Sequence, residues 1–90
     1  MNDFSMDKAI RLSEHAKMQV WRRGTTEEEI VESIRTSEWF PAELNRIQCK
    51  KDYEFNSIWN NKRYETKQVN PIFLEETTGI VVITVYVFYF

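Results

Sequence analysis

Basic side chains alternate with aromatic ones in the middle of the chain, a combination suited to nucleic acid. Cations on a sheet can hold a phosphodiester and stabilise its pentacoordinate transition state, while aromatic rings stack on bases. From this cluster and the end of the first expected helix, we predict these RNA- or phosphate-binding residues: Arg22, Arg23, Lys50, Arg63 and Tyr64. In an enzyme, Lys67 would be a catalytic cation. The plainer interpretation is surface charge and sheet packing, and a cross-strand ion pair with Glu65 or Glu54 would explain Lys67 without a function.

His15 is the only histidine, and we take it as the candidate catalytic group that moves protons. No partner for it is identifiable, which favours the alternative of a hydrogen-bonded histidine anchoring the start of the first helix. The only cysteine, Cys49, occupies an apolar position of an alternating strand and is expected to be a core thiol. One histidine and one cysteine are too few for a zinc site, so we expect no metal and no cofactor.

The composition describes a small globular protein, which we expect to form one domain over residues 1–90. Hydrophobic residues make up 42% of the chain and charged residues 29%. The net charge of -2 does not indicate nucleic-acid binding, but residues 46–74 hold six basic and three acidic side chains, which could form a basic face. The N-terminus lacks the apolar run of a signal peptide, and the C-terminal run is shorter than the about 20 residues of a membrane helix. We therefore expect a cytoplasmic protein without membrane contact.

Helical patterns fill the first half of the chain. Ser13 is expected to cap a first helix that ends at Gly24, the usual residue for a left-handed position. A capping box beginning at Thr26 starts a second helix after a short connection. These signals predict a helical pair over about residues 13–37. The pattern leaves open whether residues 5–12 extend the first helix or form a strand.

From about residue 46 to residue 90 the period changes to two, which predicts antiparallel strands. Asn60–Asn61 and the segment 77–79 provide turns between three strands. Pro71, within the second strand, requires a bulge or an unpaired edge. We predict an α+β fold in which two N-terminal helices pack on a small antiparallel sheet of three or four strands.

The last expected strand, residues 80–90, is apolar on both faces and carries no charge. Such a strand is normally covered or paired on both sides, and left exposed it would promote aggregation. We therefore expect something to pair with it: the N-terminal segment, a second copy or another protein. The residues predicted for a partner interface are Val82, Thr84, Tyr86 and Phe88.

Two stretches of the chain resemble domain-of-unknown-function family 4258, a family of short bacterial proteins. The family's opening is similar to RLSEHAKMQVWRRGTTEEEIVESI, and its terminal hairpin is similar to YETKQVNPIFLEETTGIVVITVYVFYF. The resemblance covers about residues 10–90. The chain departs from the family at Gln19, often a basic residue, and at Lys67–Gln68–Val69, where many members carry a histidine. The absent histidine removes one obvious acid–base group.

The order of helices and sheet in that family is similar to RelE and ParE toxins. This implies a RelE/ParE-toxin-like fold and a metal-independent ribonuclease or translation inhibitor, bound by an antitoxin-like protein. In that hypothesis His15 and Lys67 would be catalytic, and RNA would be the ligand. The alternative is a non-enzymatic interaction module, a homodimer or partner-bound through the C-terminal strand. The sequence leaves open whether the protein is an enzyme.

Overall fold

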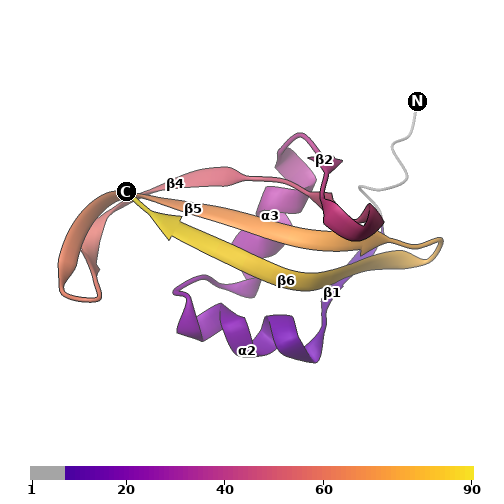
Figure 1. Cartoon of the computed structure of the whole chain (residues 1–90), viewed down its shortest axis with the longest axis horizontal. Coiled ribbons are helices and arrows are strands. Elements are labelled where there is room, and N and C mark those ends of the chain that lie inside the picture. Colours follow the sequence, from indigo (N-terminus) through magenta and orange to yellow (C-terminus); the bar gives the residue numbers. More distant parts are fainter. Residues whose placement is uncertain (1–7) are drawn as a thin grey trace.

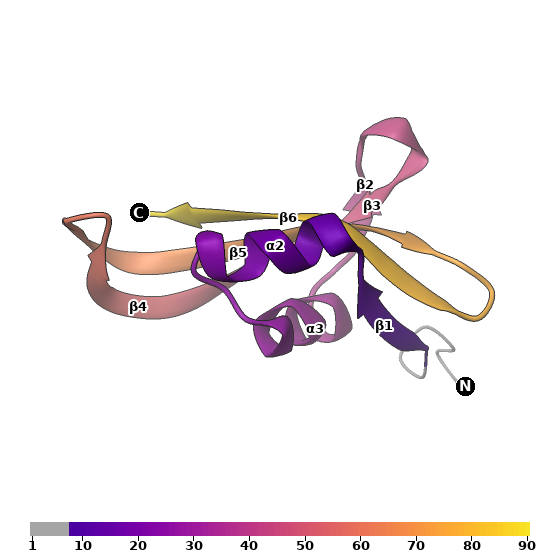
Figure 2. The same ribbon diagram turned by 90° about the horizontal axis from the view of Figure 1, so that it is seen from below.

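The computed structural model describes residues 8–90 and shows an α+β fold (Figure 1). Its helices are α2 (Glu14–Arg22), α3 (Glu27–Thr36) and a single 3-10 turn, η1 (Glu43–Asn45). Its strands are β1 (Ala9–Leu12), β2 (Phe40–Pro41), β3 (Ile47–Gln48), β4 (Lys51–Trp59), β5 (Lys62–Glu75) and β6 (Gly79–Tyr89). Both α-helices lie on one side of the sheet, and the β2–β3 loop projects from the other (Figure 2).

Both predicted helix starts are confirmed. The Ser13 hydroxyl accepts a hydrogen bond from the backbone N–H of Ala16 at 3.1 Å, and the Thr26 hydroxyl accepts one from Glu29 at 3.0 Å. Each bond satisfies a backbone donor that the first turn of a helix leaves open. Between the helices the chain reverses at Gly24, whose φ of +79° is readily adopted only by glycine.

The undecided segment before the first helix is a strand where the structure describes it, and residues 5–7 lie outside the described part. β1 runs parallel to the start of β6, with Ala9 opposite Gly79 and Leu12 opposite Val82. The sheet is therefore mixed and six-stranded, in the order β1-β6-β5-β3-β2, with β4 also paired to β5. The prediction of an antiparallel sheet of three or four strands was wrong in this respect. The N-terminal segment was one of the three partners expected for the last strand, and local periodicity could not distinguish among them.

The expected first strand is interrupted between β3 and β4, and Pro71 supplies the reason. Both strands follow β5 in one continuous register, which places Cys49 opposite Pro71. Cys49 donates its N–H to the Pro71 carbonyl at 3.4 Å, but proline has no N–H to return the bond. The side chain of Asn70 donates to the Cys49 carbonyl instead, at 2.8 Å. Pro71 thus lies inside the sheet, and the register with β6 shifts just after Ile72.

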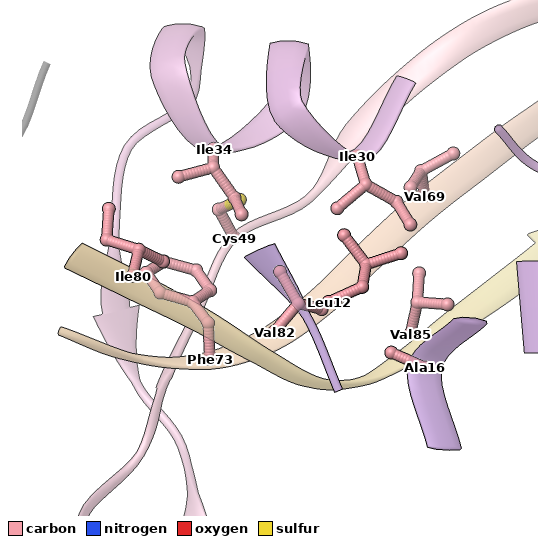
Figure 3. Packing of buried hydrophobic residues seen from close by; sticks show 10 residues of the cluster. All are labelled: Leu12, Ala16, Ile30, Ile34, Cys49, Val69, Phe73, Ile80, Val82 and Val85. Carbon is pink, nitrogen blue, oxygen red and sulfur yellow. The ribbon is translucent and has the colours of Figure 1, made fainter. Parts of the chain in front are cut away.

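The core lies between the helices and the sheet (Figure 3). Its fully buried hydrophobic side chains include Ala16, Ile30, Cys49, Val69, Phe73, Ile80, Val82 and Val85. The prediction of a core thiol is confirmed, since Cys49 is inaccessible and donates to the Ser33 carbonyl at 3.3 Å. Burial raises the pKa of this thiol to about 11.

A one-residue bulge changes which side chains of β6 face the core. The register with β5 shifts between Val82 and Thr84, leaving Ile83 as the extra residue. Val82 and Val85 are both fully buried, so the alternation changes phase at the bulge. The residues predicted as one partner interface therefore divide. Val82 belongs to the core. Thr84, Tyr86 and Phe88 lie on the face of the sheet away from α2 and α3, which we call the helix-free face.

Candidate functional site

The outer edge of β6 is protected along its first half. β1 pairs with the first residues of the strand, and side chains of α2 and its caps bond to the next backbone groups. The Ser13 hydroxyl donates to the Ile83 carbonyl at 3.0 Å. Gln19 accepts from the N–H of Val85 at 2.9 Å, and Arg23 donates to the carbonyl of Val85 at 2.8 Å. These side chains take the place of a neighbouring strand.

Beyond Val85, nothing in residues 8–90 pairs with this edge. In an antiparallel ladder the N–H and C=O of one residue point to the same side, and successive residues point to opposite sides. Because the backbone N–H and C=O of Val85 point outward, those of Val87 and Tyr89 do so as well. The backbone groups of Phe90 should then point inward, toward β5. Its N–H does donate to the Thr66 carbonyl of β5, at 3.0 Å. The edge therefore presents two outward N–H groups and two outward carbonyls.

A hollow of about 360 Å³ adjoins the open edge. It lies between the end of α2 and the tip of the β4–β5 hairpin, and its lining residues are Arg22, Arg23, Trp59, Asn60, Tyr86, Val87, Phe88 and Tyr89. The Trp59 and Tyr89 rings stack with centroids 4.9 Å apart. The Arg23 guanidinium lies 5.4 Å from the centroid of the Tyr86 ring. Cationic, aromatic and open backbone groups thus meet at one end of β6.

The helix-free face of β6 carries a row of exposed aromatic rings. Tyr86 is 44% exposed, Phe88 47% and Phe90 58%. The rings of Tyr86 and Phe88 lie nearly parallel, with centroids 6.3 Å apart. Their neighbours on β5 are polar, with Asn70 opposite Tyr86 and Gln68 opposite Phe88. The aromatic row therefore borders the open edge directly.

Lys67 occupies a structural position. It is only 8% exposed, and its ammonium group forms an ion pair with Glu29 at 2.9 Å. The same group donates to the Gly24 carbonyl at 2.9 Å. The ion pair expected with Glu65 or Glu54 is therefore made with Glu29, at the start of α3. Lys67 fastens the junction between the helices to the sheet.

His15 lies exposed on the first turn of α2, with its Nε2 3.0 Å from the side-chain nitrogen of Gln19. The Gln19 oxygen already accepts from Val85 and from the Thr84 hydroxyl, the latter at 2.7 Å. The Gln19 amide nitrogen is therefore the donor, and Nε2 of His15 is the acceptor. The hydrogen-bond partner of His15 is therefore a residue of its own helix. No hydrogen bond joins His15 to Lys67 in residues 8–90.

The predicted RNA- or phosphate-binding residues do not gather in one place. Arg22 and Arg23 line the hollow, and the ring of Tyr64 lies 5.7 Å from that of a tyrosine that lines it. Lys50 lies beside β2, 5.8 Å from the centre of a phenylalanine ring. Arg63 donates to a backbone carbonyl within the β4–β5 hairpin at 3.1 Å.

The sequence predicted that the last strand needs a pairing partner, but the predicted interface residues did not include Val87 and Tyr89. The groups concerned are backbone N–H and C=O, which every strand residue carries. The only signal for them was the absence of charge along the last strand. Trp59, which helps to line the hollow, lies among the basic and aromatic residues in the middle of the chain and was not one of the predicted site residues.

No protein-family model matches this chain. Neither a curated protein nor a solved structure matches it. The family resemblance therefore stays a prediction. In the described part of the chain, no three histidine, cysteine or acidic side chains come together as a metal site, and neither α-helix is long and apolar enough to cross a bilayer.

Proposed function

We propose that this protein is a non-enzymatic interaction module whose open β6 edge binds an extended protein segment as an added strand. The observation that carries the proposal is the pair of outward-facing residues Val87 and Tyr89. Before this point the edge is guarded: β1 pairs with residues 79–82, and the backbone N–H and hydroxyl of Ser13 donate to the carbonyls of Val82 and Ile83. The N–H and C=O of Val85 bond to the side chains of Gln19 and Arg23. Natural sheets usually block their edges, so an open stretch beside a guarded one marks a place for a partner strand.

The surroundings of the edge support the same function. A strand laid along Val87 and Tyr89 would direct alternate side chains into the adjoining hollow and toward the exposed rings of Tyr86 and Phe88. Burial of those rings would supply apolar contact in addition to the backbone bonds. The two candidate catalytic residues also favour a non-enzymatic function, though less directly. Lys67 and His15 each bond to other residues of the fold.

The test is the variant Val87→Pro, compared with Val87→Ala. Proline removes one outward N–H, and the β5–β6 ladder does not use that group; alanine keeps it and trims the same side chain. Peptides selected from a displayed random library on the wild-type protein are expected to bind Val87→Ala and to lose binding to Val87→Pro. If every selected peptide binds both variants equally, the edge is not the binding site. Circular dichroism and thermal melting establish that both variants are folded.

A second candidate function is the toxin-like one, favoured by the position of Arg22 and Arg23 beside Trp59 in the hollow. Guanidinium groups can hold a phosphate while an indole stacks on a base. The open edge would then bind an antitoxin-like protein. Incubation with mixed mRNA in EDTA, with and without ribosomes, tests it. A ribonuclease of this kind requires cleavage that is lost in His15→Ala, and absence of cleavage by the wild-type protein would exclude the ribonuclease.

A further inference from the structure

We infer that the strand bound at this edge is β6 of a second copy of the chain, paired antiparallel about a two-fold axis through Phe88. This inference rests on the proposed edge-binding function and adds the occupant and the register.

The open backbone groups are complementary to themselves. Val87 and Tyr89 lie two residues apart and both point outward, on either side of Phe88. A two-fold axis at Phe88 places Val87 opposite Tyr89 of the second copy, and Tyr89 opposite its Val87. Each such pair exchanges two backbone hydrogen bonds, so the arrangement satisfies all four open groups of each copy.

The limit of the guarded stretch and the positions of the two open residues select this register. α2 guards the edge as far as Val85, where Gln19 and Arg23 occupy the outward N–H and C=O. The segment left for a partner begins at Tyr86, and Phe88 lies midway between the two open residues, Val87 and Tyr89. In the proposed register the Val85 residues of the two copies lie beyond the paired segment, on opposite sides of the axis. The guanidinium groups at the two α2 ends therefore stay apart.

The same register pairs the exposed aromatic residues. Phe88 lies opposite Phe88 of the second copy as a non-hydrogen-bonded pair, the kind in which side chains approach most closely. Tyr86 lies opposite Phe90 of the second copy, and the converse. Three rings from each copy thus form one cluster on the helix-free face, covering side chains that are 44–58% exposed in one copy.

The charge pattern also fits a second copy. Edge strands commonly carry lysine or another charge that prevents pairing, but residues 79–90 contain no charged side chain. Two copies of this segment therefore meet without like charges opposite each other.

Disulfide trapping tests the register. Phe88→Cys is expected to form a covalent dimer under mild oxidation at least about tenfold faster than Tyr86→Cys, because residue 86 faces residue 90 of the second copy. A mixture of Tyr86→Cys and Phe90→Cys is expected to cross-link to each other. The wild-type protein is the control for Cys49, whose thiol is buried. Equal cross-linking of the Phe88→Cys and Tyr86→Cys variants would overturn the register and the inference.

Sedimentation equilibrium tests the occupant separately from the proposed function. The wild type and Val87→Ala are expected to dimerise, and Val87→Pro is expected to weaken the dimer by at least about tenfold. A wild-type monomer that binds peptides in a Val87→Pro-sensitive manner would overturn the second copy and leave the edge-binding function standing. A dimer unaffected by Val87→Pro would overturn the inference, because it would use another surface.

Discussion

The ammonium group of Lys67, a candidate for ligand binding, instead stabilises the fold. This group joins the first turn of α3, through Glu29, to the backbone of Gly24 in the preceding loop. We expect Lys67→Ala to lower the free energy of unfolding by about 2–4 kcal/mol, because it leaves the Glu29 carboxylate without its counterion. Urea denaturation followed by tryptophan fluorescence measures the change.

The control for that substitution is Lys62→Ala, since Lys62 is exposed at the start of β5. It is expected to change stability by less than about 0.5 kcal/mol. Equal effects of the two substitutions would show that the ion pair adds nothing. The result also bears on activity assays of Lys67→Ala. A loss of activity in this variant indicates a catalytic role only if the variant remains folded.

Tyr89 makes the free energy of unfolding depend on pH in the alkaline range. Burial, with a smaller contribution from the carboxylate of Glu29, raises the pKa of Tyr89 to about 12. Burial and a hydrogen bond to Glu32 raise the pKa of Tyr53 in the same direction. The unfolded chain therefore loses tyrosine protons before the folded one, and stability is fully present below about pH 10 and falls as the pH rises toward 12.

Denaturation between about pH 8 and about pH 12 measures this dependence. Tyr89→Phe is expected to show a shallower decline than the wild type over that range, because one of the groups that couples folding to proton loss is gone. At neutral pH the variant loses the hydrogen bond from the Tyr89 hydroxyl to the Arg23 carbonyl, 2.7 Å long, so the slopes and not the absolute stabilities are compared. An unchanged slope would contradict the assignment.

Among the elements, the two helix caps contribute differently to the stability of the fold. Thr26 only caps α3, by accepting from Glu29, and Thr26→Ala is expected to cost about 1 kcal/mol. Ser13 caps α2 and also donates to the carbonyl of Ile83 on β6. Ser13→Ala is expected to cost about 1.5–2.5 kcal/mol, since a cap and a bond between elements are lost together. Chemical denaturation of the two variants compares them, and equal costs would show that the bond to β6 contributes little.

The helix α2 is therefore more than a cover for the core. Together with its caps it supplies the side chains that guard the edge of β6 up to Val85, and its end at Arg22 decides where the open stretch begins. The caps of both helices could be predicted from local sequence, because a cap involves residues only three apart. The guarding contacts could not, because they join α2 to a strand more than sixty residues later in the chain.

At the scale of the whole molecule, β5 is the centre of the sheet, with β6 on one side and β3 and β4 on the other. Its middle residues, Gln68 and Val69, are expected to have the slowest amide exchange. Val85 and Val87 lie on the same edge of β6, but only Val85 has a hydrogen-bond acceptor, the Gln19 side chain. In dilute protein the Val87 amide is expected to exchange at least about 100-fold faster than that of Val85.

Hydrogen exchange followed by NMR measures these rates residue by residue. Exchange at Val87 is expected to slow as the protein concentration rises through the dimerisation range, while exchange at Val85 stays unchanged. Equal protection of Val85 and Val87 in dilute protein would mean that the edge is already occupied within one chain.

Features that depend on near neighbours could be predicted from the sequence. The caps at Ser13 and Thr26, the reversal at Gly24 and the buried position of Cys49 follow from local spacing and residue type, and the structure confirms each of them. The α+β class follows from the change of period halfway along the chain. For the candidate site, the sequence indicated only that the last strand needs cover and that arginines stand at the end of α2.

The contacts between distant segments could be learned only from the folded chain. The parallel pairing of β1, the ion pair of Lys67 with Glu29, and the phase change at Ile83 all depend on segments distant in the sequence. The phase change took Val82 out of the predicted interface, and the reach of α2 left Val87 and Tyr89 open. Spacing along the chain carries no information about such contacts, because many pairings satisfy the same local pattern and only the packing of the whole chain selects one.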